Sequence, residues 1–212
     1  MPSLYMAVLA PSVILLPITI AVLKYGYWKH ASAKRMAFAY LLFSAFFNIV
    51  ASVTTYKNVN NLPLLHLYTV LEFWIIVILF RCIFKGNRIR KLLIYLAIAF
   101  SIFSVIYIMM TDSLFAYNTL SRFLESIMIV GFCIYFLYLD FSNIASNESM
   151  FNFSVIVGLL LYFSSASILF GLSNAILKNR IFNILIWNLH ATIMLIMYLI
   201  FAWAFLRLKK AS

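Results

Sequence analysis

Residues 62–84 have the sequence LPLLHLYTVLEFWIIVILFRCIF, and this stretch decides the class of fold. An α-helix needs about 20 mostly apolar residues to cross the hydrocarbon of a bilayer, and this run is long enough to do so. Its centre nevertheless holds an acidic residue, Glu72, and His66 precedes it on the same run. The stretch therefore predicts a membrane-spanning helix that carries ionisable side chains.

Comparable runs occur along the whole 212-residue chain, which is 66% hydrophobic and 10% charged and has a mean hydropathy of +1.06. The connecting segments are too short for a soluble domain, so residues 1–212 are expected to form one all-α transmembrane bundle. Cys82 and Cys133 lie within or beside apolar runs, which argues against a disulfide framework. We predict seven spanning helices, at residues 4–23, 36–55, 62–84, 92–110, 118–141, 151–172 and 183–206.

The sixteen Lys and Arg residues are distributed unevenly among the predicted loops. Twelve of them fall on one side of the bundle, within the segments 24–35, 81–91 and 207–210. The positive-inside rule then predicts an external N-terminus and a cytoplasmic C-terminus, in a multi-pass protein of the bacterial inner membrane. The segment 140–150 departs from this pattern, because it is expected in the cytoplasm and carries no Lys or Arg. The net charge of +11 thus indicates topology and contact with the lipid bilayer, not nucleic-acid binding.

Two pairs of positions hint at an internal repeat. His66 and His190 each lie near the outer end of a predicted helix and are 124 residues apart, and Ser44 and Ser164 are 120 apart. Such an offset is typical of a 3+1+3 arrangement of helices, although matches among apolar residues also arise by chance. In the first helix, Pro11 and Pro17 should produce a kink.

Polar side chains inside spanning helices are costly, so each is a functional hypothesis. At about 1.5 Å per residue, Glu72 should lie roughly 15 Å below the outer boundary, near the midplane, with the other polar residues at or above it. The inner half of the bundle is nearly featureless by comparison, which favours a polar pocket that opens outward. The candidate ligand-binding residues are His66, Glu72, Arg122, Glu125, Asn188, His190, Asn48 and Ser164.

Helical spacing supports part of this site. Arg122 and Glu125 are three residues apart on one face, so an internal ion pair is within reach. Glu72 should be paired or protonated, because an unpaired carboxylate near the midplane is unfavourable. Asn48, Ser164 and Asn188 have a simpler interpretation as hydrogen bonds between helices.

Metal binding remains an alternative for two His and two Glu at similar depth, namely His66, His190, Glu72 and Glu125. Zn²⁺ accepts these ligand types, but the chain lacks the paired His spacing that would make a zinc site specific. No cofactor is predicted. Retinal is excluded because the predicted last helix contains no Lys in its interior to form the Schiff base.

Four segments together resemble a family of uncharacterised seven-helix membrane proteins of Gram-negative bacteria. The segments are LLHLYTVLEF (64–73), SRFLESIMI (121–129), LLYFSSASILF (160–170) and IWNLHATIMLIMY (186–198). The resemblance spans most of the chain and includes most of the candidate residues above. It implies the fold and the position of the site, but no activity.

Three functions remain open on this evidence. The first is a ligand-binding or sensory protein that passes a signal to a separate cytoplasmic or membrane partner. The second is a metal-dependent intramembrane hydrolase that uses the two His and two Glu residues. The third is a small proton-coupled transporter in which Glu72 would carry the proton. We expect the first, which is not an enzyme.

Overall fold

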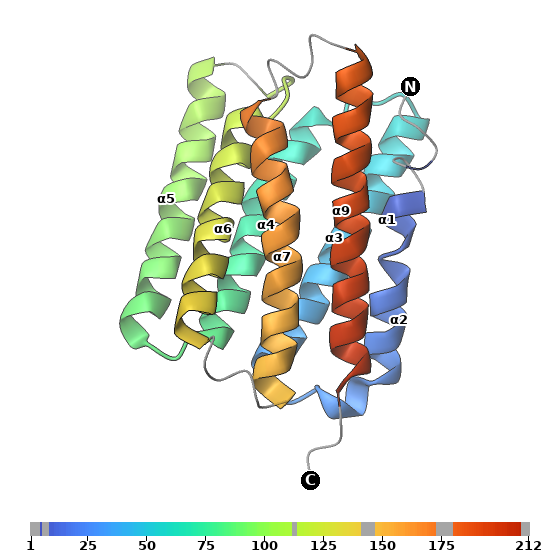
Figure 1. Ribbon diagram of the computed structural model, residues 1–212. Coiled ribbons are helices and arrows are strands. Elements are labelled where there is room, and N and C mark those ends of the chain that lie inside the picture. Colours follow the sequence, from blue (N-terminus) through green and yellow to red (C-terminus); the bar gives the residue numbers. More distant parts are fainter. Residues whose placement is uncertain (1–4, 6–8, 112–113, 141–146, 173–179, 209–212) are drawn as a thin grey trace.

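The computed structural model describes residues 5, 9–111, 114–140, 147–172 and 180–208, and this part of the chain is an all-helical bundle (Figure 1). The N-terminal part consists of two short helices and a 3₁₀ turn. These are α1 (Ala10–Ser12), α2 (Leu15–Leu23) and η2 (Tyr25–Tyr27). The long helices are α3 (Ser32–Tyr56), α4 (Leu62–Ile83), α5 (Asn87–Thr111), α6 (Thr119–Asp140), α7 (Asn147–Gly171) and α9 (Arg180–Leu206).

Six of these helices are long and apolar enough to cross a membrane, and they correspond to six of the seven predicted spans. Their outward faces are apolar, as shown by the exposed side chains of Phe46, Ile49 and Ile102. A surface of this kind suits lipid, in which a helix satisfies its own backbone hydrogen bonds. The bundle is therefore that of a multi-pass membrane protein. The seventh predicted span is the N-terminal one, and its described helical part is shorter, at Ala10–Leu23.

Helices α3 and α5 begin earlier than their apolar runs. Helix α3 starts at Ser32, where residue 36 was predicted, and α5 starts at Asn87, where residue 92 was predicted. The added turns carry basic residues such as Arg88 and Arg90. Helical geometry continues beyond the hydrocarbon because long basic side chains can reach the water from a helical turn. An apolar run thus marks the depth of the membrane and not the end of the helix.

The predicted kink in the first helix is a complete break between α1 and α2. Pro17 has no N–H group to donate to the carbonyl of Val13 four residues earlier. That carbonyl accepts a hydrogen bond from the N–H of Leu16 instead, at 3.0 Å, which forms a turn. Proline chemistry therefore divides this segment into two short helices.

Six of the described helices pack as a ring, with α5 outside it and the short α1 against α9. The sequence of contacts runs from α2 to α3, α4, α6, α7 and α9, and the contact between α9 and α2 closes the ring. Helix α5 lies at one edge and packs against α4 (Figure 1). Its buried residues form a single stripe of Leu93, Ala97, Phe100 and Ser104, as expected for a helix with one packed face.

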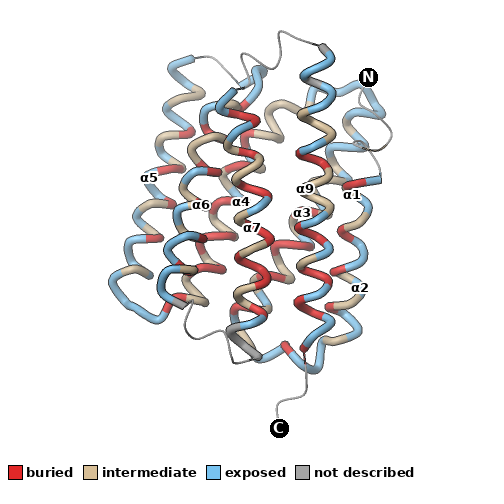
Figure 2. Tube along the Cα trace, viewed as in Figure 1, coloured by how far each residue is buried: buried red, intermediate tan, exposed pale blue. Residues whose placement is uncertain are grey.

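Buried residues line the interior of the ring along its whole height (Figure 2). In the half of the bundle that contains the C-terminal ends of α2, α4 and α9, the interior is largely apolar and aromatic. Phe73 packs against Phe100 with ring centroids 4.6 Å apart, and Phe151 packs against Phe205 at 5.1 Å. The other half contains most of the buried polar side chains, and the candidate site lies there.

The connection between α3 and α4 shapes the polar end of the bundle. Asn58 has a positive φ of 52°, a left-handed conformation that Asn tolerates better than most residues. The N–H of Val59 donates to the carbonyl of Thr54, and the N–H of Asn58 donates to that of Thr55. These two bonds end α3 in a Schellman motif. The side chain of Asn60 then accepts a bond from the N–H of Leu62 at the start of α4.

Candidate functional site

Three ionisable side chains meet inside the ring. Nη1 of Arg122 on α6 donates to Oε2 of Glu72 on α4 and, at 2.7 Å, to Oε2 of Glu125. Arg122 is 4% exposed and both carboxylates are 0% exposed. Of the two predicted states of Glu72, the paired one is confirmed, and so is the Arg122–Glu125 ion pair. Glu72 lies at the middle of α4, so the cluster is near the centre of the bundle.

The cluster is this deep because α6 begins inside the bundle. The amide of Asn118, just before α6, donates to the hydroxyl of Thr69 at 2.9 Å. One turn nearer the start of α4, Nε2 of His66 shares a hydrogen bond with the carbonyl of Ala116 at 3.2 Å. The connection before α6 therefore reaches two turns down α4, and it brings Arg122 to the level of Glu72. Sequence analysis placed Arg122 nearer the membrane surface, because a loop is normally expected outside the hydrocarbon.

Tyrosine hydroxyls complete the cluster, and sequence reasoning missed them. Tyr40 on α3 and Tyr68 on α4 both donate to Oε1 of Glu72, at 3.0 and 2.7 Å. Nη2 of Arg122 donates to the hydroxyl of Tyr162 on α7 at 3.1 Å. Tyr68 had a signal in the sequence, since residues four apart share a helix face. Tyr40 and Tyr162 had none, because their partners lie on other helices.

Aromatic rings surround the guanidinium group. Its Cζ atom lies 5.3 Å from the ring centre of Tyr68, 5.7 Å from that of Phe163 and 5.9 Å from that of Phe170. Contacts at this range are cation–π interactions, which are stronger where water is excluded. The rings and the two carboxylates together hold the cation within the apolar bundle.

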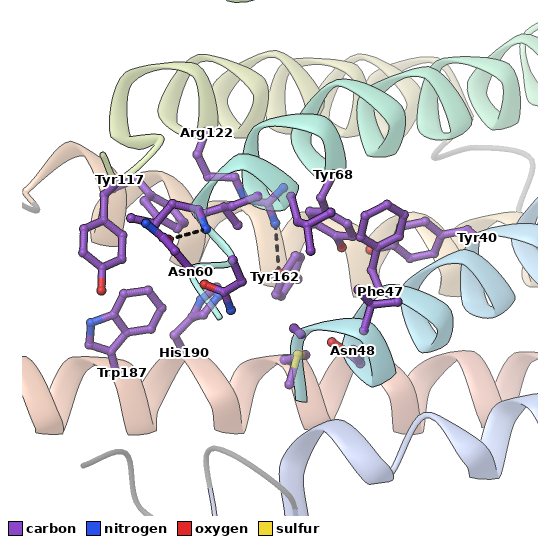
Figure 3. A pocket seen from close by; sticks show the side chains of 18 of the residues that line it. Tyr40, Phe47, Asn48, Asn60, Tyr68, Tyr117, Arg122, Tyr162, Trp187 and His190 are labelled. Atoms are coloured by element: carbon purple, nitrogen blue, oxygen red, sulfur yellow. Dashed lines mark hydrogen bonds between the residues drawn. The ribbon is translucent and has the colours of Figure 1, made fainter. Parts of the chain in front are cut away.

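A cavity of about 580 Å³ lies directly beside this cluster (Figure 3). It is bounded by α3, α4, α6, α7 and α9 and by the connections that follow α3 and precede α6. Pockets for small molecules fall in this range of volume. The polar side chains on its wall are Tyr40, Asn48, Asn60, Asn61, Tyr68, Tyr117, Arg122, Tyr162, Trp187, His190 and Tyr198.

The structure brings only some of the predicted residues to the cavity wall. Arg122, His190 and Asn48 line the cavity. The two carboxylates contact Arg122 but do not themselves line it. The other three predicted residues lie elsewhere: His66, Ser164 and Asn188 are not among the lining residues.

His190 is held in the wall of the cavity by α7. Its Nδ1 atom shares a hydrogen bond with the hydroxyl of Ser165 at 2.9 Å. Its ring lies 5.0 Å from that of Tyr162 and 6.1 Å from that of Trp187, measured between centroids. The serine that positions this histidine is thus Ser165, next to the predicted Ser164. Because Tyr162 contacts both, its ring connects His190 to Arg122.

The four residues considered as zinc ligands contact other groups of the protein. Both carboxylates bind the guanidinium group, while His66 contacts a loop carbonyl and His190 contacts a serine. Among the residues that the structure describes, no group of three or more His, Cys, Asp or Glu side chains is arranged to hold a metal ion.

Some buried polar atoms of the site have no hydrogen-bond partner within the described residues, among them Oε1 of Glu125 and Oδ1 of Asn118. Buried polar groups are normally satisfied, so each such atom calls for an explanation. Asn48 on the cavity wall contacts the hydroxyl of Tyr198 through its side-chain amide.

Comparison of the chain with models of protein families, with curated proteins and with solved structures finds no match. The conclusions on function below therefore rest on the residues and their geometry.

Proposed function

We propose that this protein is a membrane-embedded ligand-binding or sensory protein, and that its ligand occupies the cavity beside Arg122. The observation that carries the proposal is the arrangement at the cavity wall, where a buried guanidinium group is fixed by two carboxylates and by Tyr162. Ionisable groups inside a membrane bundle are retained at a cost in stability, which is typical of functional sites. A fixed polar wall beside an open volume is suited to recognition.

The proposed orientation has the cavity opening to the outside of a bacterial inner membrane, with the C-terminus in the cytoplasm. Lys24 and Lys85 belong to the connections that follow α2 and α4. These connections lie at the end of the bundle opposite the connection between α3 and α4, which borders the cavity (Figure 1). Nζ of Lys24 donates to the carbonyl of Leu208 at 3.5 Å. The C-terminal ends of α2 and α9 therefore lie at the same end of the bundle. Because basic residues favour the cytoplasm, this distribution supports the orientation. The basic face would also be the surface that meets a signalling partner.

A proton-coupled transporter is the second candidate. The cluster supports it, because two carboxylates compete for one cation inside an apolar bundle, and such groups mark proton pathways in transporters. The hydrolase alternative has no comparable support from the described residues. The 3+1+3 repeat and the resemblance to the seven-helix family of Gram-negative bacteria remain predictions.

The proposal is tested by filling the cavity. Ala51 lines it, and Ala51→Trp would occupy its volume without removing a group of the charged cluster. Ala99→Trp on the exposed face of α5 is the matched control. Each protein is purified in lipid nanodiscs, and the small molecules that co-purify are compared by mass spectrometry.

We expect the wild type and Ala99→Trp to retain the same small molecule, and Ala51→Trp to lose it. An identical set of molecules in all three proteins would contradict the proposal, because the cavity would then hold nothing specific. Accumulation of the molecule in sealed vesicles by the wild type, dependent on a proton gradient, would favour the transporter instead.

A further inference from the structure

The cavity wall presents hydrogen-bond donors that the described protein does not use. Arg122 has five N–H donors, and three of them form the bonds to Glu72, Glu125 and Tyr162. The remaining two, on Nη2 and Nε, have no acceptor among the described residues. Since Arg122 is 96% buried and still lines the cavity, these donors are available to a molecule inside it and to little else.

Two further donors lie on the same wall. The hydroxyl oxygen of Tyr162 accepts a bond from Arg122, which leaves its own hydrogen to be donated. The amide of Asn48 carries two N–H donors, and its contact with the hydroxyl of Tyr198 leaves at least one of them for a molecule in the cavity. Figure 3 shows Tyr162 and Asn48 on two different helices, with Arg122 on a third. The wall is thus equipped to meet acceptor oxygens at more than one point.

The charge of the cluster decides what kind of acceptor fits. Glu72 already pairs with the guanidinium group, and Glu125 also contacts it. An anion at Arg122 would place a further negative charge beside Glu72 in a region of low dielectric, where repulsion is strong. A cation would have to lie against N–H donors, since neither carboxylate lines the cavity. An uncharged ligand avoids both costs.

Another part of the wall is apolar and aromatic. Phe170 and Trp187 lie edge to face with centroids 6.0 Å apart, and Met194 and Leu65 line the cavity with them. Such surfaces favour an apolar or aromatic body, while the few fixed polar groups set its orientation.

We infer that the cavity selects an uncharged molecule with carbonyl-type acceptor oxygens on an apolar, ring-sized body. Its oxygens accept hydrogen bonds from Arg122, Tyr162 and Asn48, and its body lies against the rings of Phe170 and Trp187. This inference rests on the proposed function and specifies the chemical class of the ligand.

The test uses four probes with the same ring system and different polar groups. They are 1-acetylnaphthalene, a neutral ketone; 1-naphthoate, an anion; 1-naphthylmethylammonium, a cation; and 1-ethylnaphthalene, which has no acceptor. Binding to the full-length protein in nanodiscs is measured by equilibrium dialysis, with protein-free nanodiscs to subtract partition into lipid. We expect 1-acetylnaphthalene to bind most tightly of the four.

Two pairs of variants show whether the donors are responsible. Asn48→Leu and Tyr162→Phe each remove one donor from the wall and should weaken binding of the ketone about five- to tenfold, without effect on 1-ethylnaphthalene. Their controls lie away from the cavity. Asn152→Leu also removes a side-chain amide from a long helix, and Tyr135→Phe removes the hydroxyl of a half-exposed tyrosine. Neither control should change the affinity.

Tighter binding of the anion or of the cation would overturn the inference and leave the proposed function standing. Equal binding of the ketone and 1-ethylnaphthalene would also overturn it, because recognition would then be apolar only. If no probe binds above the lipid background, the inference fails, and the co-purification experiment with Ala51→Trp decides separately whether the cavity holds a ligand.

Discussion

Glu72 and Glu125 share one guanidinium group but differ in their other contacts. Glu72 accepts hydrogen bonds from Tyr40, Tyr68 and Arg122, so both of its oxygens are engaged. Glu125 accepts one bond from Arg122 through Oε2, and its Oε1 is buried without a partner in the described chain. At the scale of single residues, Glu72 is therefore the structural centre of the cluster.

This difference predicts unequal effects of the same substitution. In Glu72→Gln the amide NH₂ group would face donors, so we expect a loss of about 2–4 kcal/mol in the free energy of unfolding. Glu125→Gln keeps one acceptor for Arg122 and should cost about 1 kcal/mol. Unfolding of the two variants in mixed detergent micelles measures the difference. Equal losses would show that the tyrosine hydroxyls contribute nothing to the role of Glu72.

At the scale of elements, Asn58 ends α3 and positions the connection that borders the cavity. Its left-handed backbone costs a β-branched residue about 1–2 kcal/mol, so Asn58→Val should destabilise the protein by that amount. Asn58→Gly should be neutral or slightly stabilising, because glycine adopts this conformation without strain. Thermal unfolding of both variants in detergent checks the prediction, and equal stability of the two would refute the motif as the cause.

The packing of α7 against α9 depends on the absence of a side chain at Gly158. A Cβ atom at that position would lie 3.3 Å from the ring of Phe201 and 3.4 Å from Cγ of Met197. Small residues allow such close approach between helices in membranes. Gly158→Leu should therefore lower the free energy of unfolding by about 1–3 kcal/mol through overpacking.

Gly131→Leu is the matched control for that experiment. A Cβ atom at Gly131 on α6 would meet nothing within 4 Å, so a side chain there has space. Its expected change is within about 0.5 kcal/mol. If both leucine variants unfold alike, the contact between α7 and α9 is not limited by Gly158.

At the scale of the whole molecule, the proposed orientation predicts which loops reach the outside. In a background where Cys82 and Cys133 are replaced by Ser, Val59→Cys lies beside the cavity and Gly86→Cys lies between α4 and α5 at the other end. A membrane-impermeant maleimide should label Val59→Cys in intact spheroplasts. It should label Gly86→Cys only after permeabilisation, since the basic end is expected in the cytoplasm. The reverse labelling pattern would show that the cavity opens to the cytoplasm.

The sequence by itself determined the membrane class, six long spans and the pairing of Arg122 with Glu125. These features depend on local properties, namely the length of apolar runs and the faces shared at three or four residues. Helix ends were predicted less well at α3 and α5, because a helix continues past the hydrocarbon wherever basic side chains can reach water.

Only the tertiary structure decided what Glu72 contacts. Its bond with Arg122 joins residues 50 apart, and that between Arg122 and Tyr162 joins residues 40 apart. Helical periodicity indicates which side chains share a face, but not which helix that face meets. The depth at which α6 begins also depends on contacts across helices, between Asn118 and Thr69. The cavity follows from these contacts, because its wall consists of residues from five helices that only the folded ring brings together.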